Sequence, residues 1–157
     1  MNTSTPSRHA PSTTTQSSPL AANRLGDSIG LRLGGVVALG AITYIHGLDV
    51  KSKLDEVPYL GVGYILLMVS CVIAAALLLS PGRTARRFGW QFGATVAALT
   101  FIGFVLTRTV GLPNAMDDKG NWGETLGIWS LITEGAMVVM GIVATGLFRS
   151  RSAHTAR

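Results

Sequence analysis

Three side chains that could do chemistry lie in or beside long apolar stretches. Glu134 lies within TLGIWSLITEGAMVVM, His46 within YIHGLDV and Arg108 within FVLTRTVGLP. A carboxylate deep in an apolar helix is costly unless it is protonated, paired or beside water. Glu134 is therefore interpreted in one of two ways. It is a hydrogen-bonded group that holds helices together, for example through Thr100 or Ser130, or a proton-exchanging or ligand-contacting carboxylate in an outward-open pocket.

The other two residues are candidates for the same pocket. Arg108 ends its apolar stretch and is the natural electrostatic partner for Glu134, although its long side chain can instead reach the lipid headgroups. His46 is the only histidine within an apolar stretch. It is interpreted either as an interfacial polar residue or as a group at the mouth of the pocket.

Four apolar stretches must position these residues, and they cover 29–48, 58–80, 88–107 and 125–148. Each has about 20 residues or more, enough at about 1.5 Å per residue to cross a hydrocarbon core of about 30 Å. Of all residues, 48% are hydrophobic and 13% charged. We therefore predict an all-α fold, a four-span transmembrane helical bundle formed by residues 24–148.

The flanking segments and the arginines predict the topology. Residues 1–23 are rich in Ser, Thr and Pro, which predicts a disordered tail; the alternative is a cleaved organellar transit peptide. Residues 149–157 form a basic tail. Every arginine except Arg108 falls on one side of a four-span bundle. The positive-inside rule then predicts a multi-pass protein of the plasma membrane with both termini in the cytoplasm.

Small residues indicate where the helices pack. Gly89 and Gly93, and likewise Gly123 and Gly127, are spaced four residues apart, which lets two helix backbones approach closely. Ser130 lies on the same helical face as Gly127 and is also predicted to face inward. Because such faces also serve association between chains, the partners we expect are the lipid bilayer and a homo-oligomer or larger membrane complex.

Several classes of function lack their motifs in this sequence. It contains no Walker loop, no GxSxG and no GxGxxG, and His9 and His154 lie too far outside the apolar stretches to bind a buried haem. The segment MDDKGNWGE does not match an EF-hand. The net charge of +5 is not gathered into a basic cluster with aromatic residues. We therefore expect no cofactor, no metal and no nucleic-acid partner.

Two short motifs support the topology. VPYLG at 57–61 begins the second apolar stretch, and TVGL at 109–112 follows the third and precedes the acid Glu134. In these motifs the chain resembles a group of small bacterial four-helix membrane proteins. It departs from them at Met68, where the group has Asn. No activity is assigned to that group, so the resemblance implies the topology and no reaction.

The sequence thus predicts a non-enzymatic integral membrane protein, an accessory, assembly or interaction subunit. The alternative is a small-ligand, ion or proton-handling membrane protein with an outward-facing polar pocket around Glu134. An enzyme that acts on lipid or quinone would need a second buried acid or histidine, and the sequence does not reveal one.

Overall fold

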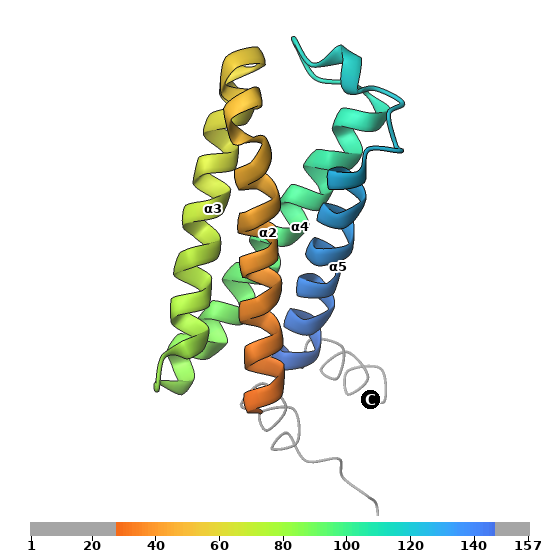
Figure 1. The fold of residues 1–157 in the computed structure, drawn as a ribbon. Coiled ribbons are helices and arrows are strands. Elements are labelled where there is room, and N and C mark those ends of the chain that lie inside the picture. The colour runs from red at the N-terminus through yellow and green to blue at the C-terminus, as the bar shows by residue number, and fades with distance from the viewer. Residues whose placement is uncertain (1–27, 147–157) are drawn as a thin grey trace, which may run out of the picture.

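The structure, a computed structural model, describes residues 28–146, which form a bundle of four long helices (Figure 1). The elements are α2 (Ile29–Glu56), α3 (Pro58–Leu79), α4 (Arg83–Thr109), the short 3-10 helix η1 (Met116–Asp118) and α5 (Thr125–Thr145). The predicted all-α four-helix fold is confirmed. The predicted tails, 1–23 and 149–157, and the end of the stretch 125–148 lie outside the described residues.

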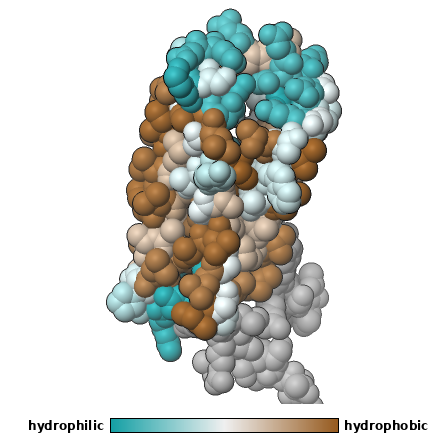
Figure 2. Space-filling model, in the orientation of Figure 1, coloured by the Kyte–Doolittle hydropathy of each residue, from teal (hydrophilic) through white to brown (hydrophobic). Residues whose placement is uncertain are grey.

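All four helices are long and apolar enough to cross a membrane. Even the shortest, α5, has 21 residues, which matches a hydrocarbon core of about 30 Å. Figure 2 shows hydrophobic residues over the sides of the bundle and hydrophilic residues gathered at one end. The chain is therefore a multi-pass integral membrane protein.

The helix ends follow from local chemistry. Pro58 is the first residue of α3, where its missing N–H costs nothing. Gly111 has a φ of +82°, and its N–H donates to the carbonyl of Leu106 at 3.0 Å, so it turns the chain away from α4. Gly146, at the end of α5, has a φ of +68°, and its N–H donates to the carbonyl of Ile142 at 3.1 Å. The glycine of the TVGL motif thus has a structural role.

The helix α2 is longer than its apolar stretch. It continues beyond Leu48 to Glu56 through a polar segment. Within that segment Lys51 Nζ lies 2.7 Å from Asp55 Oδ2, one helical turn away, and such pairs support exposed helices. Leu48, the last residue of the apolar stretch, therefore lies within α2 and not at its end.

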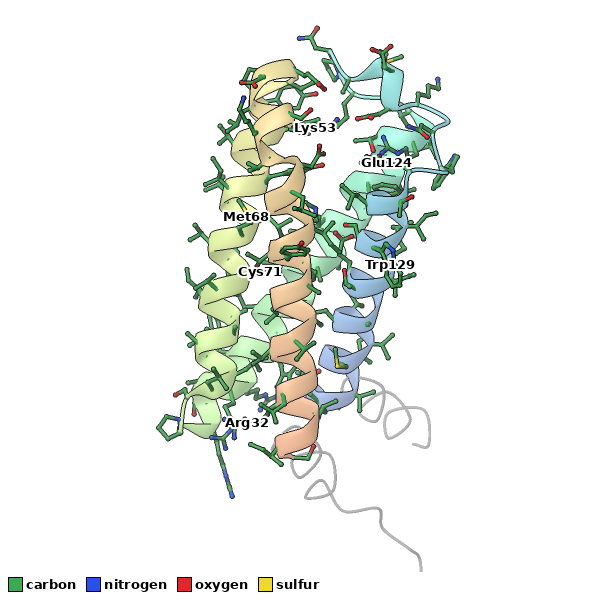
Figure 3. All side chains as sticks on the ribbon, in the orientation of Figure 1. Arg32, Lys53, Met68, Cys71, Glu124 and Trp129 are labelled. Carbon is green, nitrogen blue, oxygen red and sulfur yellow. The ribbon has the colours of Figure 1, made fainter. Side chains whose placement is uncertain are left out.

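The bundle has two chemically distinct ends. The arginine end holds the turn between α3 and α4 and carries Arg32 near the start of α2 and Arg83, Arg86 and Arg87 in the first turns of α4. The loop end holds the junction of α2 and α3 and the connection 110–124 between α4 and α5. Figure 3 shows Arg32 at the arginine end and Lys53 and Glu124 toward the loop end. We call the adjoining halves of the bundle the arginine half and the loop half.

Close packing dominates the arginine half. A Cβ at Gly89 would lie 2.9 Å from Leu77 Cβ and 3.1 Å from the backbone nitrogen of Leu78, so glycine is needed for helix contact there. A Cβ at Gly93 would lie 2.7 Å from Met137 Cε, the end of a flexible side chain. The largest fully buried apolar side chains gather around this region: Leu39, Ile42, Leu78, Trp90 and Met137. The interior of this half is apolar.

The glycines of α5 differ from one another. A Cβ at Gly127 would lie 2.5 Å from the Phe104 ring of α4. Gly123, which was expected to pack like Gly127, lies before the first residue of α5, and a Cβ placed there would meet no described atom within 4 Å. The close contact of α4 with α5 at this end therefore begins at Gly127.

Candidate functional site

A cavity of about 220 Å³ lies in the loop half, and all four helices contribute to its wall. His46 comes from α2, Tyr64 from α3 and Ser130 from α5. The wall also contains two glycines, Gly63 on α3 and Gly103 on α4, and a Cβ placed at either would meet no described atom within 4 Å. Missing side chains on two facing helices thus leave the space open.

The floor of the cavity is formed by His46 and Ser130, with Glu134 behind them. Glu134 is 0% exposed. The Ser130 hydroxyl donates to Glu134 Oε1 at 2.6 Å, and His46 Nε2 lies 3.8 Å from the same oxygen. The other carboxylate oxygen, Oε2, has no hydrogen-bond partner among the described residues. The floor thus covers a buried acid that is only half satisfied.

The orientation of the His46 ring is fixed by its backbone contact. Nδ1 lies 2.9 Å from the carbonyl oxygen of Ile42, and because a carbonyl only accepts, Nδ1 carries the hydrogen. The neutral ring therefore turns the lone pair of Nε2 toward Glu134. The Tyr64 ring packs edge to face on His46, with 4.7 Å between centroids.

The rim of the cavity is a chain of alternating charges. Arg108 is 5% exposed. Its Nη1 lies 2.9 Å from Asp118 Oδ1, its Nη2 pairs with Glu124, and its guanidinium lies over the Phe104 ring. Asp118 also lies 3.5 Å from Lys53 Nζ on α2. The rim thus joins α2, α4 and the connection before α5.

The predicted pair of Arg108 with Glu134 is wrong. Arg108 pairs with Asp118 and Glu124, and Glu134 accepts from Ser130. Arg108 lies at the level of Glu124, which precedes α5, whereas Glu134 lies ten residues further on, a rise of about 15 Å along a helix. Two residues can therefore both lie in the loop half and still differ in their position along the bundle axis.

His46 lies deeper than an interfacial residue. Because α2 extends to Glu56, His46 is enclosed by the bundle, is 6% exposed and lies next to Glu134. The sequence did not reveal that this histidine is buried beside the acid. Asp49 and Lys53 also line the cavity and were not predicted, although their spacing of three and seven residues from His46 puts all three on one helical face.

The arrangement is suited to binding through hydrogen bonds and charge. Within residues 28–146, no group of three or more His, Cys, Asp or Glu side chains is placed to hold a metal ion. Comparison with known protein families, curated proteins and solved structures finds no match for this chain. The site's own geometry therefore carries the functional argument.

Proposed function

We propose that this membrane protein binds a small ligand in the cavity of the loop half, with His46 and Ser130 as the polar floor and Glu134 directly behind them. The observation that carries the proposal is a cavity, walled by all four helices, that ends above a fully buried carboxylate with one oxygen unsatisfied by the described residues. An unsatisfied buried polar group costs free energy. Polar residues within membranes typically serve function, and a ligand that meets His46 and Ser130 would act on this carboxyl group through them.

The arginine half supports a site that is reached from one side. Below Glu134 on α5, the buried residues are Met137, Gly141 and Ala144. Opposite them Leu39 and Trp90 fill the interior. An apolar interior offers no polar groups that could bind an ion or a polar solute on its way through the bundle. The geometry therefore favours binding over conduction through a single chain.

We propose that the loop end faces the outside of the plasma membrane and that both termini are cytoplasmic. Arg32, Arg83, Arg86 and Arg87 lie at the arginine end, whereas the loop end carries most of the acids. This distribution follows the positive-inside rule. The resemblance to small bacterial four-helix membrane proteins implies the same topology.

The rival function is that of an accessory or interaction subunit, in which the polar floor only holds helices together. Native mass spectrometry of the full chain, extracted in mild detergent, separates the two functions. The matched variant is Gly103→Leu, because Gly103 lines the cavity and a Cβ there meets no described atom within 4 Å, so the added side chain would take up cavity space. Binding predicts a small-molecule adduct on the wild type that the variant lacks. Identical spectra together with a copurified membrane subunit would favour the rival.

A further inference from the structure

The lining of the cavity indicates which class of ligand it binds, an inference that rests on the proposed function. We infer that the ligand is a small organic cation, a protonated amine carried on an apolar body. The charge balance of the wall, the hydrogen-bonding character of the floor and the apolar side chains between floor and rim each support this class.

The charge balance is negative. Three carboxylates line the cavity, those of Asp49, Asp118 and Glu124, against two cations, Lys53 and Arg108. Both cations are engaged at the rim by Asp118 and Glu124.

Two carboxylates are left without a permanent cation. Among the described residues none forms an ion pair with Asp49, and the only basic group near Glu134 is His46. Opposite charges attract strongly where water is scarce, so a ligand that brings one positive charge is favoured.

The floor accepts hydrogen bonds. The Ser130 hydroxyl hydrogen is used on Glu134, so its oxygen is left as an acceptor toward the cavity. His46 also lines the cavity, and its neutral ring has an acceptor at Nε2, while the carboxyl group of Glu134 lies directly behind both groups. A ligand head that meets these groups must donate hydrogen bonds, as an ammonium group does with up to three N–H bonds.

The rim holds one further donor that the described residues leave unsatisfied. Within residues 28–146, Arg108 Nε is buried without a hydrogen-bond partner. The guanidinium charge is already matched by Asp118 and Glu124, so this N–H suits a neutral oxygen better than an anion.

The walls between floor and rim suit an apolar body. They include Leu60, Leu67, Leu126 and the rings of Tyr64 and Phe104, and aromatic faces attract cations. The cavity volume of about 220 Å³ exceeds the volume of about 150 Å³ that is known to admit benzene. One ring with a short aminoalkyl chain therefore fits.

Isothermal titration calorimetry of the full chain in mild detergent tests this ligand class with three probes of one shape. The probes are phenethylamine (cation), 2-phenylethanol (neutral) and phenylacetate (anion), each corrected by titration into detergent alone. We expect phenethylamine to bind most tightly, with its affinity about tenfold weaker in Glu134→Gln and abolished in Gly103→Leu. Asp49 lies on the cavity wall and outside the core. Asp49→Asn is therefore expected to weaken the binding of phenethylamine and not that of the other two probes.

The controls separate the two proposals. If 2-phenylethanol or phenylacetate binds as tightly as the amine, and Gly103→Leu abolishes that binding, the cation inference is overturned and the binding cavity stands. If no probe binds, or if all bind Gly103→Leu as they bind the wild type, both are overturned. If Glu134→Gln does not fold by circular dichroism and gel filtration, Asp49→Asn decides. Amine affinity unchanged in that variant overturns the inference.

Discussion

The two halves of the bundle differ at their glycines, because among the described residues only the loop half has glycines on the wall of a cavity. In the arginine half, a Cβ at Gly35 would lie 2.7 Å from the Trp90 ring, and one at Gly141 would lie 2.5 Å from Ala94 Cβ. In the loop half, a Cβ at Gly63 or Gly103 would meet no described atom within 4 Å. Glycine thus brings helices together in the arginine half, whereas in the loop half it does so at Gly61 and Gly127 but borders open space at Gly63 and Gly103.

This difference shows how a small membrane bundle can hold a cavity. Helices in lipid associate through close packing and hydrogen bonds, because lipid tails are as apolar as the helices. The tight arginine half supplies that packing. In the loop half, an open space forfeits dispersion attraction between the helices. Links across its mouth compensate, from Lys53 to Asp118 and from the Tyr59 hydroxyl to the carbonyl of Pro113 at 2.6 Å.

The largest expected effect comes from the buried tryptophan of the arginine half. Trp90 is 1% exposed, so Trp90→Ala leaves a large void and should lower the free energy of unfolding by about 3–5 kcal/mol. The matched control is Trp129→Ala, because Trp129 is 55% exposed and faces the surroundings of the bundle. Reversible unfolding in mixed micelles measures both. Equal losses in the two variants would contradict a core confined to the interior of the bundle.

Alanine at two glycines should have effects of opposite sign. Gly141→Ala forces α4 and α5 apart and should cost about 1–3 kcal/mol. Gly103→Ala adds a methyl group to open space and removes a helix-weakening glycine, so its effect should be neutral to stabilising. The same unfolding assay compares the two. A similar loss in both would show that the cavity wall is as tightly packed as the arginine half.

The rim offers a smaller effect on stability and a clear effect on access. Asp118→Asn removes the charge that joins Lys53 to Arg108, which should cost about 0–1 kcal/mol. It should also speed modification of Thr107→Cys on the cavity wall by a membrane-impermeant thiol reagent. The control is Asp55→Asn, which breaks only the exposed pair with Lys51. An unchanged modification rate in Asp118→Asn would show that the rim does not restrict access.

The fold could be predicted because hydropathy reports it directly. A stretch of about 20 apolar residues must be helical in lipid, since the backbone has no other hydrogen-bond partners there. The first stretch, 29–48, identified α2 but not its end, because the following turns to Glu56 are polar. The length of an apolar stretch therefore locates a membrane span but does not show where the helix ends.

The site could be predicted only in part, because pairing depends on depth and rotation. Glu134, His46 and Arg108 were each identified as unusual, yet Arg108 lies too close to the loop end to reach Glu134. Its partner Asp118 lies in the connection between α4 and α5, where the sequence has no periodic pattern from which the direction of a side chain could be predicted. The cavity itself depends on Gly63 and Gly103, whose surroundings no local pattern reveals.

The central claim is that the loop half contains a water-accessible cavity and that the arginine half is closed. Thr100 and Ala97 test it most directly, because they lie one helical turn apart on α4, with Thr100 on the cavity wall and Ala97 in the buried core. Thr100→Cys and Ala97→Cys are treated in membranes with an impermeant thiol reagent, and the wild type, whose Cys71 is buried, gives the background. The account predicts modification at 100 and none above background at 97. Equal modification at both positions, or none at 100, would contradict it.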